Sequence, residues 1–131
     1  MKILVTGAAG YLGAELCRQA LARGDDVLAA QHVSPPPYGR AIRLDVRDED
    51  AVHRTLMRHG PHAVFHTAYV QADADTIVRG SASVAAAAHR CSARLVHLST
   101  DLVFDGEHGA PYTEDDEPRP VMAYGAAKLE A

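Results

Sequence analysis

Three glycines near the N-terminus constrain the fold of this chain more than any other feature. Gly7 and Gly10 lie between a short apolar run at residues 2–6 and a segment, residues 11–23, whose apolar side chains recur at helical spacing, and Gly13 lies near the start of that segment. A glycine turn between a buried strand and a helix gathers backbone N–H groups and the positive end of a helix dipole around one point. Such a point can hold a pyrophosphate, so the sequence predicts a dinucleotide site. The alternative is a strand-to-helix turn that binds no ligand.

Apolar runs alternate with helical patterns along the rest of the chain. Further strands are predicted at residues 27–30, 41–44, 63–66 and 94–99, and further helices at 48–59, 75–90 and from about 121. The prolines in residues 34–39 predict an irregular loop, because proline lacks an N–H and fixes φ. Alternating strands and helices imply right-handed crossovers and a parallel sheet. We therefore expect an α/β fold, a Rossmann-type doubly wound parallel sheet truncated after about five strands.

Composition and charge exclude several classes of function. The 131 residues form one predicted domain with 47% apolar residues and a net charge of -4, which argues against a nucleic acid partner. No apolar run reaches the length of a membrane span, and no signal peptide is recognised, so a cytoplasmic location is expected. Neither the cysteines nor the histidines have metal-ligand spacing, and no metal is predicted. Of the histidines, His97 is expected in the core with its hydrogen bonds satisfied, and His66 in a positional role near the cofactor.

Tyr124 and Lys128 lie four residues apart in the last predicted helix, so their side chains project from one face. A ketone reduction needs a proton donor at the carbonyl oxygen and a hydride donor at its carbon. An adjacent ammonium is expected to lower the pKa of the tyrosine from about 10, and the lysine can also bind a nicotinamide ribose. Thr100, with Ser99 beside it, follows the fifth predicted strand and can orient the substrate oxygen. The carboxyl ends of parallel strands are where a cofactor lies.

These motifs carry a resemblance to a known family. The spacing G-x-x-G-x-x-G resembles the extended branch of the short-chain dehydrogenase/reductase superfamily, and residues 98–106, 111–115 and 124–130 are similar to the dTDP-4-dehydrorhamnose reductase family. The resemblance implies reduction of a 4-keto-6-deoxy sugar nucleotide by NAD(P)H, with Thr100, Tyr124 and Lys128 as catalytic residues.

The resemblance also implies which residues hold the cofactor. They are Gly7, Gly10, Tyr11, Leu12, Gly13, Asp45, Val46, Ala68, Tyr124 and Lys128. Asp45 and Val46 would hold the adenine, and Ala68 would line the ribose side. Taken alone, Asp45 is almost as well explained as a helix cap.

The choice between the two nicotinamide cofactors depends on charge near the second strand. An acidic residue there would accept from the ribose 2′-OH of NAD, and none occurs between residues 27 and 44. His32, Arg40 and Arg43 are nearby cations that could meet a 2′-phosphate. The sequence therefore predicts a mild preference for NADP(H), with NAD(H) as the alternative.

Two residues depart from the family pattern, and the family members are longer. Leu102 stands where the family usually has tyrosine, and Ile77 where a helix asparagine is expected. We expect residues 1–131 to be the NAD(P)-binding domain, with the C-terminal substrate-binding part absent and no turnover by this chain alone. A non-catalytic dinucleotide-binding regulatory module and a sugar-nucleotide epimerase or dehydratase are the alternatives. Thr100, Tyr124 and Lys128 favour an enzyme over the binding module, and Thr100 with residues 103–106 favours a reductase over an epimerase or dehydratase. A homodimer is a further possibility.

Overall fold

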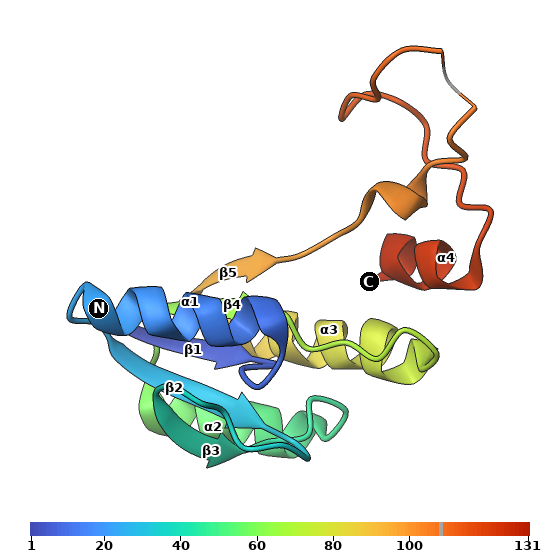
Figure 1. Ribbon diagram of the computed structural model, residues 1–131. Coiled ribbons are helices and arrows are strands. Elements are labelled where there is room, and N and C mark those ends of the chain that lie inside the picture. Colours follow the sequence, from blue (N-terminus) through green and yellow to red (C-terminus); the bar gives the residue numbers. More distant parts are fainter. Residues whose placement is uncertain (108) are drawn as a thin grey trace.

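A five-stranded parallel sheet with helices on both faces forms the body of the protein in this computed structural model, which describes residues 1–107 and 109–131 (Figure 1). The strands are β1 (Lys2–Thr6), β2 (Asp26–Gln31), β3 (Arg40–Arg43), β4 (Ala63–His66) and β5 (Arg94–His97). The helices are α1 (Tyr11–Ala22), α2 (Glu49–His59), α3 (Ala74–Arg90) and α4 (Ala123–Glu130), with a short 3-10 helix η1 (Asp101–Val103).

The strand order β3-β2-β1-β4-β5 confirms the predicted doubly wound sheet. After β1 the chain moves to one side of that strand to form β2 and β3, and it later returns to the other side to form β4 and β5. The connections diverge at the carboxyl ends of β1 and β4, and that divergence opens a crevice where ligands bind in this class of sheet.

Alternating side chains of the central strand enter two separate cores. Leu4 packs with apolar residues of α2 and α3 on one face, whereas Ile3 and Val5 pack with residues of α1 on the other. All three are buried. A strand covered on both faces reads as a continuous apolar run, which is why β1 could be recognised from sequence.

The region after β5 differs most from the predicted elements. The fifth strand ends at His97 rather than at residue 99, and the chain then turns through η1, which the sequence did not predict. The hydroxyl of Thr100 accepts from the N–H of Leu102 at 3.3 Å and so caps η1. Figure 1 shows that η1 and α4 lie beyond the carboxyl end of β5, and α4 packs beside α3 and η1.

Among the described residues, none of the helices combines the length and the apolar character that crossing a membrane would require. The cytoplasmic location and the homodimer stay predictions.

Candidate cofactor cleft

The glycine turn after β1 is built for close approach of backbone to backbone. Gly7 has a φ of +66°, and a Cβ there would lie 2.8 Å from the backbone nitrogen of Ala68. A Cβ at Gly13 would overlap the carbonyl group of Gly7. Only glycine satisfies both positions, because any side chain would push the turn away from α1 or from the loop after β4. Gly10 is the N-cap residue of α1.

Two adjoining cavities lie at the carboxyl edge of the sheet and form one cleft. The first, of about 580 Å³, lies against the ends of β2, β3 and β4. The second, of about 530 Å³, lies between the glycine turn and α4. Residues that line both cavities are Gly7, Gly10, Thr67 and Tyr69.

Every residue predicted to bind cofactor or to act in catalysis lines this cleft. The first cavity is lined by Asp45, Val46 and Ala68. The second is lined by Tyr11, Leu12, Gly13, Thr100, Tyr124 and Lys128. Gly7 and Gly10 belong to both. Segments far apart in the chain therefore meet around a single hollow, and their roles there stay predictions.

Lys128 is held firmly beside the second cavity. Its side chain is buried, and its Nζ donates to the carbonyl oxygen of Leu98 at 3.0 Å. The same Nζ lies 5.6 Å from the ring centroid of Tyr69, which is a cation–π contact. Burial lowers the pKa of Lys128. The carbonyl and the ring together orient the ammonium toward the cleft.

The pKa of Tyr124 shifts in the direction opposite to the sequence-based expectation. Burial, followed by the proximity of Tyr69, raises this pKa. The ring centroids of Tyr69 and Tyr124 are 5.9 Å apart. The expectation that Lys128 lowers this pKa is wrong, because burial and Tyr69 set the direction of the shift. The phenol therefore stays protonated at neutral pH.

Thr100 lines the same cavity. Its hydroxyl donates to Asp101 Oδ1 at 3.1 Å while it caps η1. Nearby, Gly125 of α4 lies so close to η1 that a Cβ would overlap the carbonyl oxygen of Leu102. This contact seats α4, and with it Tyr124, against the segment that carries Thr100. At the other departure from the family pattern, Ile77 is buried in α3 and brings no polar group.

A pair of histidines lies behind the cleft. His66 is buried at the end of β4, with Nδ1 2.8 Å from the hydroxyl of Thr6 and Nε2 3.1 Å from the hydroxyl of Ser81. Its ring stacks on that of His97, with centroids 5.5 Å apart. The buried Nε2 of His97 has no hydrogen-bond partner among the described residues, so the predicted satisfied core histidine is wrong. His66 cannot be that partner, because both of its ring nitrogens already lie within hydrogen-bond distance of a hydroxyl. β5, which carries His97, is an edge strand of the sheet.

The buried imidazole of His66 makes stability depend on pH. Burial, followed by the charges of His97 and Lys128, lowers the pKa of His66 from 6.5 to about 4. The unfolded chain therefore takes up this proton at higher pH, so the stability is full above about pH 6.5 and falls as the pH drops toward about 4. We expect urea denaturation to show about 2 kcal/mol lower stability at about pH 5 than at about pH 7. His66→Gln should remove most of this difference, and an unchanged pH dependence would contradict the assignment.

Of the three cations expected near the adenosine end, one lines the cleft and two do not. His32 lines the first cavity, and its Nδ1 is 3.7 Å from Asp45 Oδ2. Arg40 and Arg43 lie on β3 and line neither cavity. Asp45 is not a helix cap: Asp48 is the N-cap of α2 and accepts from the N–H of Ala51 at 2.9 Å.

Two further cleft residues were not found by sequence reasoning. Tyr69 lines both cavities and contacts Tyr124 and Lys128. Arg47 lines the first cavity and binds Asp45. Each stands one or two positions after a predicted cofactor residue, which is the signal that could have drawn attention to them. Among the described residues, no group of three or more His, Cys, Asp or Glu side chains could share a metal ion.

Fold and cleft together define a Rossmann-type α/β domain with a ligand cleft at the carboxyl edge of its sheet. The chain belongs to the RmlD substrate binding domain family, whose profile matches residues 1–131. It is 40% identical over 131 residues to a dTDP-4-dehydrorhamnose reductase of Burkholderia thailandensis, covering 98% of this chain and 43% of that protein.

Two other similarities bear on function. The chain is 32% identical to the methionine adenosyltransferase 2 subunit beta of Danio rerio, covering 98% of this chain and 43% of that protein. The Bordetella bronchiseptica enzyme WbmG, solved in complex with NAD and UDP, superposes with a TM-score of 0.88 at 29% identity, over 98% of this chain and 46% of that one. The chain thus spans less than half the length of these relatives.

Proposed function

We propose that this chain is the cofactor-binding part of an NAD(P)H-dependent reductase that acts on a 4-keto-6-deoxy sugar nucleotide. The observation that carries the proposal is the single cleft that joins the glycine turn to Thr100, Tyr124 and Lys128. Similarity to the Burkholderia thailandensis reductase supports the substrate class. The NAD and UDP bound in WbmG support a cofactor and a nucleotide-sugar ligand of this kind.

The residues of the cleft fit a dinucleotide. The turn at Gly7 and Gly13 leaves no room for a Cβ, so its backbone can approach a pyrophosphate without an intervening side chain. A bound dihydronicotinamide supplies hydride. The phenol of Tyr124 donates a proton to the carbonyl oxygen of the substrate, Lys128 binds the nicotinamide ribose, and the hydroxyl of Thr100 orients the substrate oxygen.

The reaction is tested with the complete enzyme. We expect oxidation of NADH or NADPH when a dTDP-4-keto-6-deoxy sugar is added, with one reduced sugar formed per cofactor oxidised. The 131 residues alone are expected to bind cofactor without reducing the sugar. Conversion of the sugar nucleotide without net cofactor oxidation would indicate an epimerase or a dehydratase instead.

A regulatory module is the second candidate, because the chain is similar to the methionine adenosyltransferase 2 subunit beta of Danio rerio. Such a module would bind a dinucleotide and leave sugar nucleotides unchanged. Dinucleotide binding together with a complete absence of sugar reduction by the complete protein would favour this candidate.

The mild preference for NADP(H) stays a prediction with narrower support. Of the three cations that suggested it, only His32 lines the first cavity, and WbmG was solved with NAD. We expect NADPH to bind a few-fold more tightly than NADH when the quenching or enhancement of dihydronicotinamide fluorescence is titrated. His32→Gln should bring the two dissociation constants together. Equal or tighter binding of NADH by the wild type would contradict the predicted preference for NADP(H).

A further inference from the structure

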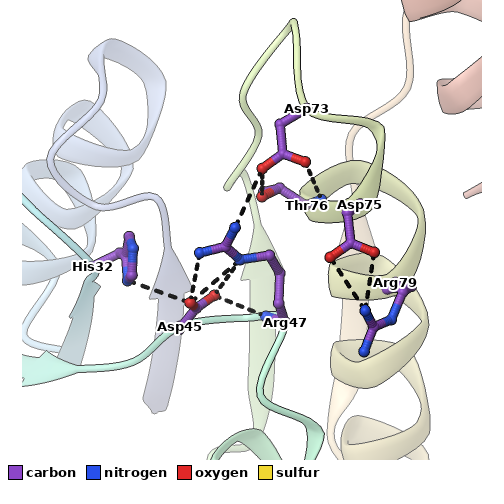
Figure 2. Close-up of polar contacts among 7 residues, drawn as sticks. All are labelled: His32, Asp45, Arg47, Asp73, Asp75, Thr76 and Arg79. Carbon is purple, nitrogen blue, oxygen red and sulfur yellow. Dashed lines mark hydrogen bonds and ion pairs between the residues drawn. The ribbon is translucent and has the colours of Figure 1, made fainter.

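Arg47 donates several hydrogen bonds to the carboxylate of Asp45 (Figure 2). Its Nε donates to Asp45 Oδ1 at 3.0 Å, and its Nη2 donates to Asp45 Oδ2 at 2.8 Å. The backbone N–H of Arg47 also donates to Oδ1 at 3.0 Å. A paired, charge-assisted contact of this geometry fixes the orientation of the carboxylate as well as its position.

The same guanidinium extends to the start of α3. Figure 2 shows Arg47 between Asp45 and Asp73, and its Nη1 reaches Asp73 Oδ2 at 3.5 Å. Asp73 is the N-cap residue of α3, where it accepts from the N–H of Thr76 at 3.2 Å and from its hydroxyl at 2.6 Å. Arg47 therefore ties the end of β3 to the start of α3. These four residues all line the first cavity, so the tie joins two of its walls.

The hydrogen bonds from Arg47 determine how Asp45 can interact with a ligand. The hydrogen bonds from Arg47 lower the pKa of Asp45 to about 2, so the carboxylate is ionised at neutral pH. An ionised carboxylate only accepts hydrogen bonds, and its two oxygens have about four lone-pair sites. The side chain of Asp45 is 31% exposed and lines the cavity, so it can accept from a ligand as well as from Arg47.

We infer that Arg47 is a positioning residue that orients the Asp45 carboxylate so that the adenosine end of the cleft selects adenine over a 6-oxopurine base. The inference rests on the proposed function, in which this cleft binds a nicotinamide dinucleotide. Adenine presents an exocyclic amino donor to the carboxylate. Hypoxanthine presents a carbonyl oxygen at the same position, and two acceptors repel each other. Without the guanidinium, the carboxylate keeps the bond from the backbone N–H of residue 47 to Oδ1 but loses the paired contact, so its orientation is less fixed and the selection weakens.

The test compares NADH with reduced nicotinamide hypoxanthine dinucleotide, which differs from NADH only in the purine. Dissociation constants are measured by dihydronicotinamide fluorescence for the wild-type chain, Arg47→Ala and Arg47→Lys. We expect the wild type to bind NADH about tenfold more tightly than the analogue, because a hydrogen bond to a charged group is lost and a repulsion is added. Arg47→Ala should remove most of this selectivity. Arg47→Lys, which keeps the charge but not the paired geometry, should fall between them.

Arg79→Ala is the matched control. Arg79 forms an ion pair with Asp75 at 3.1 Å on the outside of α3, and it lines neither cavity (Figure 2). This variant removes an arginine from the same region and should leave the selectivity unchanged. Thermal melting of all variants reports whether Arg47 also supports the fold, which is a separate effect.

The possible outcomes separate the inference from the proposed function. If Arg47→Ala weakens the binding of NADH and of the analogue by the same factor, Arg47 is only structural and the inference is overturned. If the wild type binds NADH without discriminating against the analogue, the inference is likewise overturned while the proposed cofactor cleft stands. If the wild type binds no dinucleotide, the proposed function fails and the inference fails with it.

Discussion

Tyr124→Phe in the complete enzyme is expected to lower the turnover of a 4-keto-6-deoxy sugar nucleotide by about 10²- to 10⁴-fold, because the variant removes the proposed proton donor. The ring remains, so its packing beside Tyr69 is kept. Binding of the cofactor should therefore change little, and the loss should lie in turnover rather than in affinity. Steady-state kinetics with NAD(P)H oxidation as the signal, together with a separate cofactor titration, distinguish the two.

Tyr38→Phe is the control for this experiment. Tyr38 is exposed, lies in the proline loop and lines neither cavity. Loss of its hydroxyl should leave turnover unchanged. Full activity of Tyr124→Phe would show that Tyr124 is not the proton donor and that another group donates the proton. A loss of cofactor affinity as large as the loss of turnover would instead give this phenol a binding role.

Gly13→Ala is expected to destabilise the chain by about 3 kcal/mol, the upper part of the range for overpacking a close contact. A Cβ at Gly13 would overlap the carbonyl group of Gly7 and lie 2.9 Å from the Cα of Ala8. These are backbone atoms, so no side-chain rotation can relieve the overlap. The turn would have to move away from α1, and NADH binding should be lost with it. Urea denaturation and a fluorescence titration measure the two effects.

Gly109→Ala is the matched control, since, apart from its two chain neighbours, no described residue places a heavy atom within 4 Å of a Cβ built at Gly109. That variant should change the stability by less than about 0.5 kcal/mol. If Gly13→Ala were equally harmless, the close approach of the glycine turn to α1 would not constrain the sequence. Retained NADH binding by a destabilised Gly13→Ala would separate the stability of the turn from its proposed role as a phosphate cradle.

Most elements of the fold follow from local patterns. The strand at residues 63–66 and the end of α2 at His59 agree with the sequence prediction, because a buried apolar run and a Gly-Pro pair are local signals. The shortened β5 and the added η1 were not foreseen. The cap that Thr100 forms with the N–H of Leu102 is local, whereas the close packing of Gly125 against Leu102 joins segments 23 residues apart.

The candidate site also combines features that the sequence predicted with features that it did not. Its glycines, its carboxylate Asp45 and the pair Tyr124 and Lys128 could be named from spacing and order, and the structure brings them to one cleft. The direction in which the pKa of Tyr124 shifts could not be predicted from the sequence. It depends on burial and on Tyr69, which lies 55 residues earlier in the chain.

Sequence patterns alone were enough to predict the parallel α/β fold, the place of the glycine turn and part of the cleft lining, because strands, helices and turns are set by patterns only a few residues long. The tertiary structure alone decided which groups are partners. Arg47 joins Asp45 to Asp73, and Lys128 donates to the carbonyl of Leu98. The buried Nε2 of His97 finds no hydrogen-bond partner within residues 1–107 and 109–131. Hydrogen bonds and desolvation depend on distances between segments far apart in the chain, and only folding determines those distances.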